Sequence, residues 1–208
     1  WFFEQSATYM ENVIFPNSTH LRTMLSNCNV VTPLTFPEHS IGYPYEIYPY
    51  RSALWQKFLV ENYGDSSIVR YQWEEYGLQY ASGQNISLYP IYENSIQIAT
   101  NYEISMEKAV SDYGLWRYFT GDRYLENQFF DEGSFYCTSA TIQPEDLDSI
   151  ITEQGSAKFI ELPNEDHNIT IDTDSPMINS RYVKIQADEL IVQEIYMDNP
   201  QFNYFAEE

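Results

Sequence analysis

Two carboxylates near the start of this chain, Glu4 and Glu11, have a spacing that places them on one side of a helix. The small side chains of Ala7 and Thr8 lie between them on the same stripe, which would let a second helix approach closely. Carboxylate oxygens can ligate a metal ion or accept a hydrogen bond from an imidazole N–H. An ordinary amphipathic helix without any chemistry is the alternative interpretation. The opposite, apolar side of the predicted helix carries Phe2, Phe3, Tyr9, Met10, Val13 and Ile14.

The histidines of the chain do not form a metal site by their spacing. His20, His39 and His167 are isolated from one another, whereas two imidazole ligands on one helix are separated by four residues. The sequence also contains no Gly-x-Ser-x-Gly motif, phosphate-binding glycine-rich loop or dinucleotide-binding fingerprint. The carboxylates of the opening segment are therefore the residues to which a chemical role can be assigned.

Cys28 and Cys137 do not belong to a Cys-x-x-Cys pair, which excludes a zinc site built from cysteines. If the protein is secreted, the two thiols could form a disulfide. Closing a loop of about 100 residues would stabilise the fold by ~4–5 kcal/mol in the chain-entropy model. Two buried free thiols are an equally supported interpretation.

The opening pattern Trp1-x-x-Glu4-x-x-Ala7 resembles the second zinc-binding helix of the gluzincin metallopeptidases. The fuller pattern over residues 1–11 is similar to the MXAN_6640-like family of secreted bacterial metalloproteases. Further short motifs of this resemblance are scattered over about residues 1–160, at 52–59, 115–123 and 130–133. The resemblance implies a zinc enzyme that hydrolyses peptide bonds with a metal-activated water.

The resemblance also implies roles for four residues. Glu4 matches the third zinc ligand, and Glu11 would orient a histidine ligand by accepting its ring N–H. A solvent-facing or capping acid is the alternative for Glu11. Tyr48 and Tyr50 precede a predicted helix and are the candidates for stabilising the oxyanion of the tetrahedral intermediate.

The His-Glu-x-x-His motif of a zinc peptidase is absent from the sequence. We expect it to lie upstream of Trp1, in the N-terminal remainder of the same precursor, and we expect this chain alone to be inactive. The expected partners are that remainder and a peptide or protein substrate. The alternative function is a non-catalytic extracellular structural or adhesion protein, acidic and rich in aromatic residues, on the same scaffold.

The composition is acidic and aromatic. Ten Lys and Arg against 31 Asp and Glu give a net charge of −21, which would repel nucleic acids and anionic membrane surfaces. The 19 Tyr, 12 Phe and 4 Trp suit a carbohydrate- or peptide-binding groove, or alternatively a core built with tyrosine. No apolar stretch approaches the ~18–20 residues that cross a bilayer, so we expect no membrane span. The resemblance to a secreted family implies a secreted or cell-surface location.

A second cation is suggested by the segment 166–174. Asp166, Asp172 and Asp174 could bind calcium, although their spacing does not match a helix-loop-helix calcium loop. A plain acidic turn is the alternative interpretation of the same residues.

The periodicity of apolar residues predicts an α+β fold. We expect residues 1–140 to be mainly helical, as the lower half of a zincin-like catalytic domain, with a Tyr-Pro loop over 27–49. Residues 141–208 alternate with period two and predict a small antiparallel β-rich module that is incomplete. The predicted helices are 1–14, 20–25, 50–63, 66–77 and 105–119, and the predicted strands are 158–162, 168–172, 182–185 and 190–196.

Overall fold

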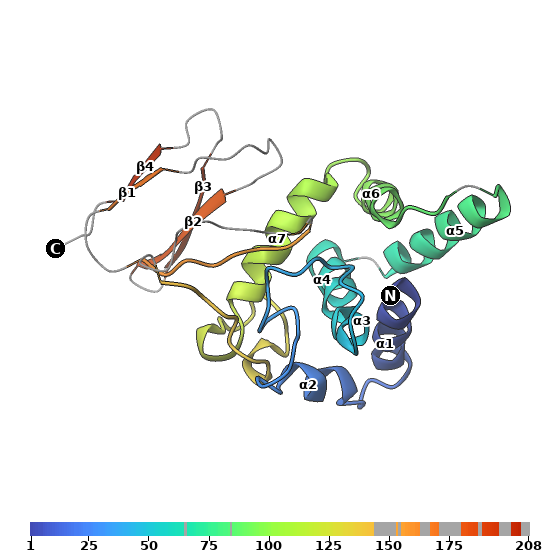
Figure 1. Ribbon diagram of the computed structural model, residues 1–208, viewed down its shortest axis with the longest axis horizontal. Helices are drawn as coiled ribbons and strands as arrows, with labels where there is room; N and C mark the ends of the chain where they lie inside the picture. The colour runs from blue at the N-terminus through green and yellow to red at the C-terminus, as the bar shows by residue number, and fades with distance from the viewer. Residues whose placement is uncertain are drawn as a thin grey trace.

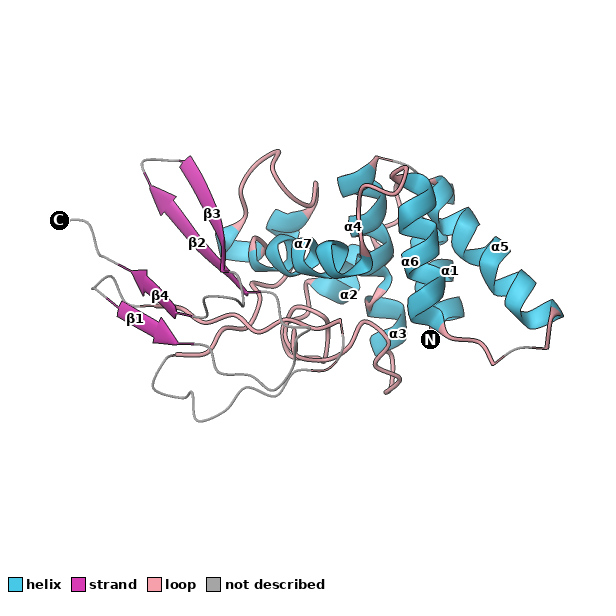
Figure 2. Ribbon diagram, turned by 90° about the horizontal axis from the view of Figure 1, so that it is seen from above, coloured by secondary structure: helices cyan, strands magenta, loops and turns pink. Residues whose placement is uncertain are grey.

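The computed structural model describes residues 1–64, 66–83, 85–143, 153, 155–162, 167–170, 180–186, 189–195 and 201–204. The described chain is mainly helical, as predicted, and its strands follow the helices in sequence. In Figures 1 and 2 the helices α1, α4, α5 and α6 gather at one end of the molecule and the strands at the other, with α7 between them.

The elements have the following bounds. The α-helices are α1 (Phe2–Ile14), α2 (His20–Leu25), α3 (Tyr48–Arg51), α4 (Ala53–Tyr63), α5 (Ser67–Ala81), α6 (Leu88–Ala99) and α7 (Met106–Tyr118). Two short 3-10 helices follow, η1 (Gly121–Arg123) and η2 (Gly133–Phe135). The strands are β1 (His167–Thr170), β2 (Ser180–Gln186), β3 (Glu189–Ile195) and β4 (Gln201–Tyr204).

Local signals placed two helix ends correctly. Gly64 follows α4 with a φ of 71°, the left-handed conformation that ends a helix and that glycine adopts without strain. Ser105 precedes α7, and its hydroxyl accepts the backbone N–H of Lys108 at 3.3 Å. Both ends depend on residues within one helical turn, which is why the sequence alone predicts them.

The prediction that Gly77 ends α5 is wrong. The helix passes through Gly77 and continues to Ala81. The residues after Gly77 are Leu78, Gln79, Tyr80 and Ala81, which can all continue a helix. After α5, the glycine that adopts a positive φ is Gly83, at 69°. The left-handed turn therefore comes two residues after Ala81, the last helical position.

The centre of the core is α4, which contacts α1, α5 and α7. Its side chains Leu54, Trp55, Phe58 and Leu59 are fully buried. The indole of Trp55 and the ring of Phe58 both contact the phenol of Tyr113 on α7, at centroid distances of 5.1 and 5.3 Å. Aromatic rings thus do much of the packing that aliphatic residues do elsewhere.

The buried face of α1 differs from the predicted apolar side. Phe2 and Tyr9 are buried, but Phe3, Met10, Val13 and Ile14 are exposed. The helix buries three polar residues in their place, Gln5, Ser6 and Thr8.

Hydrogen bonds to distant residues explain why a glutamine lies in the core. Gln5 Nε2 donates to Ser52 Oγ at 3.1 Å, and Gln5 Oε1 accepts the hydroxyl of Tyr92 at 2.6 Å. Gln56 Nε2 donates both to Gln5 Oε1 at 3.0 Å and to Gln72 Oε1 at 2.8 Å. These bonds connect α1, α4, α5 and α6, and a buried polar group with partners is tolerated in a core.

The strands form two antiparallel pairs, β2 with β3 and β1 with β4. The predicted segments 168–172, 182–185 and 190–196 overlap β1, β2 and β3, while β4 was not predicted. The remaining predicted strand, 158–162, is not formed as a strand among the described residues. Its one described pairing is an isolated bridge between Ile160 and Ile142. An ion pair joins the β2–β3 pair to the helices: Arg181 Nη1 of β2 lies 2.8 Å from Asp112 Oδ1 of α7. A separate β-rich module stays a prediction.

Candidate functional site

Glu4 lies in the first turn of α1, and its side chain is 38% exposed. Its Oε2 lies 3.3 Å from the backbone nitrogen of Trp1. A hydrogen bond from its own backbone N–H holds the pKa of this carboxyl below its ordinary value, against the opposing effect of burial. Glu4 is therefore a charged carboxylate at neutral pH whose side chain is partly exposed, while its Oε2 is itself buried.

The residues around Glu4 do not complete a metal site within the described part of the chain. No three His, Cys, Asp or Glu side chains lie close enough together there to hold a metal ion. Structural and catalytic zinc sites use three or four protein ligands. The predicted calcium ligands Asp166, Asp172 and Asp174 lie outside the described residues.

Glu11 pairs with a histidine of its own chain. Its Oε2 lies 3.0 Å from His20 Nδ1, and its Oε1 accepts the hydroxyl of Ser18 at 3.2 Å. The turn at Pro16 brings the start of α2 back to the end of α1. The sequence predicted that Glu11 would orient a zinc-bound histidine from the segment upstream of Trp1. It did not predict a pairing with His20, which is nine positions away in the chain.

We expect the substitution His20→Ala to raise the pKa of Glu11. The hydrogen bond from His20 is the main cause that lowers this pKa, with further contributions from the charge of His20 and from Ser18. Because the folded pKa is depressed, the favourable contribution of Glu11 is present above its unfolded pKa and is lost as the pH falls through the folded pKa. Carbon-detected NMR titration of the glutamate carboxyls measures the change, with Glu74 as the internal control. An unchanged Glu11 titration in the variant would contradict the pairing.

Tyr48 and Tyr50 lie two positions apart in α3 and have different surroundings. Tyr48 is 1% exposed, and its hydroxyl has no hydrogen-bond partner among the described residues. Burial raises the pKa of Tyr48 far above its ordinary value. Tyr50 is 41% exposed. Of the two, Tyr50 is the one open to a substrate in this structure, and an oxyanion-stabilising role stays a prediction.

Two buried arginines hold the Tyr-Pro loop, and the sequence did not reveal them. Arg51 Nη1 donates to the carbonyl of Val31 at 2.6 Å. Arg117 Nη1 donates to the carbonyls of Pro33 and Pro37 at 3.1 and 3.2 Å. Because proline residues lack an N–H, the loop can form few backbone bonds of its own, and the guanidinium groups satisfy its carbonyls instead.

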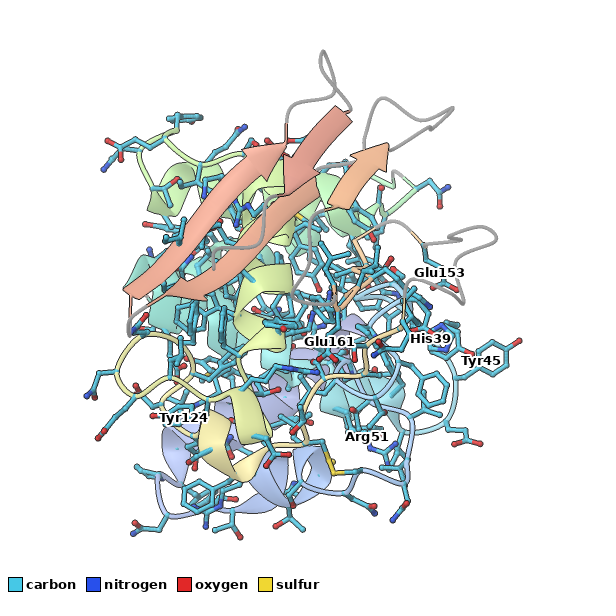
Figure 3. All side chains as sticks on the ribbon, turned by 90° about the vertical axis from the view of Figure 1, so that its left-hand side faces the viewer. His39, Tyr45, Arg51, Tyr124, Glu153 and Glu161 are labelled. Carbon is cyan, nitrogen blue, oxygen red and sulfur yellow. A yellow bond between two sulfur atoms is a disulfide. The ribbon has the colours of Figure 1, made fainter. Side chains whose placement is uncertain are left out.

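The outer part of this loop carries a column of stacked rings. His39 stacks on Tyr43 at a centroid distance of 3.7 Å and on Phe36 at 5.7 Å, and Tyr45 contacts Tyr43 at 5.1 Å. Figure 3 shows His39 below Glu153 and Tyr45 extending away from the body of the molecule. His39 Nδ1 lies 3.6 Å from Glu153 Oε1. We call Phe36, His39, Tyr43 and Tyr45 the aromatic column.

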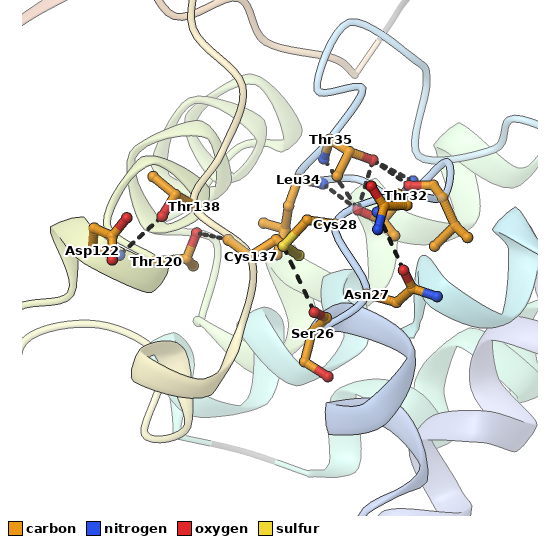
Figure 4. Close-up of a disulfide and its surroundings, with 12 residues drawn as sticks. Ser26, Asn27, Cys28, Thr32, Leu34, Thr35, Thr120, Asp122, Cys137 and Thr138 are labelled. Atoms are coloured by element: carbon orange, nitrogen blue, oxygen red, sulfur yellow. Dashed lines mark hydrogen bonds between the residues drawn. A yellow bond between two sulfur atoms is a disulfide. The ribbon is translucent and has the colours of Figure 1, made fainter.

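A disulfide joins Cys28 to Cys137, which decides between the two interpretations of the cysteines (Figure 4). It fixes the start of the loop to the segment after η2. The backbone N–H of Cys137 donates to the carbonyl of Leu25 at 2.9 Å, and its own carbonyl accepts the hydroxyl of Thr120 at 2.8 Å. The loop is therefore anchored by a covalent bond at one end and by Arg117 further along.

Comparisons with known proteins add no family to these observations. No protein-family model, curated protein or solved structure matches this chain. The resemblance to the gluzincin metallopeptidases therefore stays a prediction that depends on the motifs themselves. Among the described helices, none combines the length and the apolar character that crossing a bilayer requires.

Proposed function

We propose that this chain is part of a secreted zinc metallopeptidase of the gluzincin type, in which Glu4 supplies one zinc ligand. The observation that carries the proposal is the position of Glu4 beside a partly exposed apolar stripe of α1, in which Phe3 also contacts Trp73 and Tyr76 of α5 at centroid distances of 5.2 Å. Phe3, Met10 and Ile14 are 47%, 37% and 63% exposed. Together with Ala7 they recur at intervals of four and three residues, the spacing by which one helix packs against another.

The expected occupant of this stripe is a helix that carries His-Glu-x-x-His in the N-terminal remainder of the precursor. Glu4 would then face that helix from the edge of the stripe, with Ala7 allowing close approach. A bound zinc ion would supply a Lewis acid for peptide-bond hydrolysis. The residues of this chain would contribute one carboxylate oxygen, from Glu4, and a surface phenol at Tyr50. The chain alone would be inactive.

The disulfide supports a secreted or cell-surface location. Disulfides persist in oxidising compartments and are rare in the cytosol. The bond between Cys28 and Cys137 fits that pattern.

Glu4→Gln in the longer chain tests the proposal. The coding region ahead of Trp1 is read, the extended protein is produced, and zinc is measured by mass spectrometry alongside hydrolysis of a labelled protein substrate. We expect a His-Glu-x-x-His motif upstream, stoichiometric zinc in the wild type, and loss of both zinc and hydrolysis in Glu4→Gln. Glu74→Gln is the matched control, because Glu74 is an exposed carboxylate on α5 that pairs with Arg70 at 3.3 Å. An upstream region without the motif, or zinc retained by Glu4→Gln, would overturn the proposal.

The aromatic column favours a second candidate function, a non-catalytic extracellular binding or adhesion protein. Rigid exposed aromatic rings give large contact area at low entropic cost. Phe36 and Tyr45 are exposed at the ends of the column, on a loop held by Arg117 and by the disulfide. Binding of a polysaccharide or protein that Tyr45→Ala abolishes, in a precursor without His-Glu-x-x-His, would establish this function instead.

A further inference from the structure

The connection between α1 and α2 contains an N-glycosylation sequence, Asn17-Ser18-Thr19. An asparagine two positions before a serine or threonine is the acceptor of N-linked oligosaccharides, which secreted proteins carry on surface loops. In Figure 1 this connection runs along the lower edge of the molecule. It therefore lies where a bulky, hydrophilic oligosaccharide can project into solvent.

The two residues that define this sequence have exposed side chains. Asn17 and Thr19 are both exposed. The hydroxyl of Ser18, between them, donates to Glu11 Oε1 at 3.2 Å and accepts the backbone N–H of His20 at 3.3 Å. Thr19 precedes α2, but its hydroxyl makes no capping hydrogen bond to that helix. The middle residue is thus bonded to the protein, while the acceptor amide and the threonine hydroxyl lie at the surface.

The backbone around Asn17 forms a tight turn. The N–H of Ser18 donates to the carbonyl of Phe15 at 2.7 Å, which makes Pro16 and Asn17 the central residues of a four-residue turn. Pro16 disfavours a helical conformation at Phe15, where α1 ends, and proline suits the first central position of such a turn. The local sequence therefore builds the turn that presents the acceptor.

An exposed aromatic ring lies two residues before the acceptor. The side chain of Phe15 is 62% exposed and does not belong to the hydrophobic core. The face of an aromatic ring carries partial negative charge, so it attracts the polarised C–H groups on the apolar face of a sugar ring. The Cα atoms of Phe15 and Asn17 lie within about 7 Å of each other, because one residue separates them. The first sugar on Asn17 could therefore reach the ring.

The chain contains two further sequences of this type, at Asn85 and Asn168. Asn85 is exposed in the connection from α5 to α6, but the residue two positions before it is Gly83. Asn168 lies in β1, where its backbone pairs with β4, and the corresponding residue is Asp166. Of the three asparagines, Asn17 is the one that an aromatic residue precedes at this distance.

We propose that Asn17 carries an N-linked oligosaccharide whose first sugar packs on the ring of Phe15. The side-chain nitrogen of Asn17 attacks the anomeric carbon of an oligosaccharide carried on a polyprenyl diphosphate. The new N–C bond forms as the C–O bond to the diphosphate breaks, and the amide proton passes to a base of the transferase. The proposal rests on the secreted location inferred above, but it uses neither Glu4 nor zinc. Its failure and the failure of the metallopeptidase proposal are therefore distinguishable.

Mass spectrometry of the protein purified from its own source tests the modification. We expect a mass above that of the polypeptide, and we expect peptide N-glycosidase to remove the excess and to leave an aspartate at position 17 in the peptide map. In a secreting cell that attaches N-linked oligosaccharides, Thr19→Ala should abolish the modification of Asn17, and Thr19→Ser, which keeps the hydroxyl, should retain it. Asn85→Gln is the control and should leave it unchanged. An unmodified Asn17 in the native protein, or a modified Asn17 in Thr19→Ala, would overturn the proposal.

Thermal unfolding separates the packing on Phe15 from the modification itself. Enzymatic removal of the oligosaccharide from the folded wild type should lower the melting temperature by roughly 2–4 °C, the shift expected in a chain of this length for the loss of one such contact. In Phe15→Ala, the same removal should change it by less than about 1 °C. The variant should fold, because the exposed ring is lost while the backbone N–H that bonds to the carbonyl of Glu11 remains. Equal shifts in the wild type and in Phe15→Ala would rule out packing of the sugar on the ring.

Discussion

Replacing the disulfide with Cys28→Ser and Cys137→Ala is expected to lower the free energy of unfolding by ~4–5 kcal/mol. The bond joins residues 109 positions apart, so the oxidised unfolded chain loses a large share of its conformational freedom. For a chain of this size, that loss corresponds to a fall in melting temperature of roughly 8–20 °C. Urea denaturation followed by circular dichroism gives the free energy, and differential scanning calorimetry gives the temperature.

Reduction of the wild-type protein provides the control for this variant. Dithiothreitol should lower the stability of the wild type to that of the double variant, and it should leave the variant unaffected. Thiol titration of the unfolded wild type without reductant should detect no free cysteine. Two titratable thiols, or equal stability of variant and wild type, would contradict the bond between Cys28 and Cys137.

Gln5→Leu is expected to destabilise the protein by ~2–5 kcal/mol, although it exchanges a polar core residue for an apolar one of similar size. The substitution removes the acceptor used by the Tyr92 hydroxyl and Gln56, and the donor used by Ser52. Each buried group left without a partner costs about 1–3 kcal/mol. Denaturant unfolding of the variant measures the total.

Two further variants separate hydrogen bonding from packing at Gln5. Gln79→Leu is the matched comparison, because Gln79 on α5 is partly exposed and bonds to Glu75 one turn away and to the backbone N–H of Ser87 at 3.4 Å, so the change should cost about 1 kcal/mol or less. Adding Tyr92→Phe to Gln5→Leu should restore about 1 kcal/mol or more, since it removes the orphaned hydroxyl. If Gln5→Leu is as stable as the wild type, the polar network contributes no stability.

The sequence predicted the helices better than their orientation. Helix ends depend on neighbouring residues such as Ser105 and Gly64, which can be recognised from local pattern alone. The direction in which α1 faces depends on Tyr92 and Ser52, which are 87 and 47 positions from Gln5. A pattern that sorts residues by hydropathy cannot anticipate that a glutamine will find partners so far along the chain.

In the candidate site, too, the sequence predicted the local relations and missed the contacts between distant residues. Glu4 and Glu11 were located by spacing, because their relation is contained in a single helix. The pairing of Glu11 with His20 crosses the turn between α1 and α2, and the burial of Tyr48 depends on packing of the Tyr-Pro loop near Arg117. The disulfide was one of two equal alternatives until the folded chain placed the Cα atoms of its cysteines 5.4 Å apart.

The hydrogen bonds that Cys137, Ala140 and Ala157 donate to residues 25–37 have a consequence for biosynthesis. The carbonyls of Leu25, Leu34 and Pro37 accept the backbone N–H groups of Cys137, Ala140 and Ala157, each at 2.9 Å. At translation rates of roughly 5–20 residues per second, the loop leaves the ribosome roughly 5–20 seconds before these donors are made. Cys28 therefore cannot pair with Cys137 during that interval. This disulfide can form only after the second half of the polypeptide has been made.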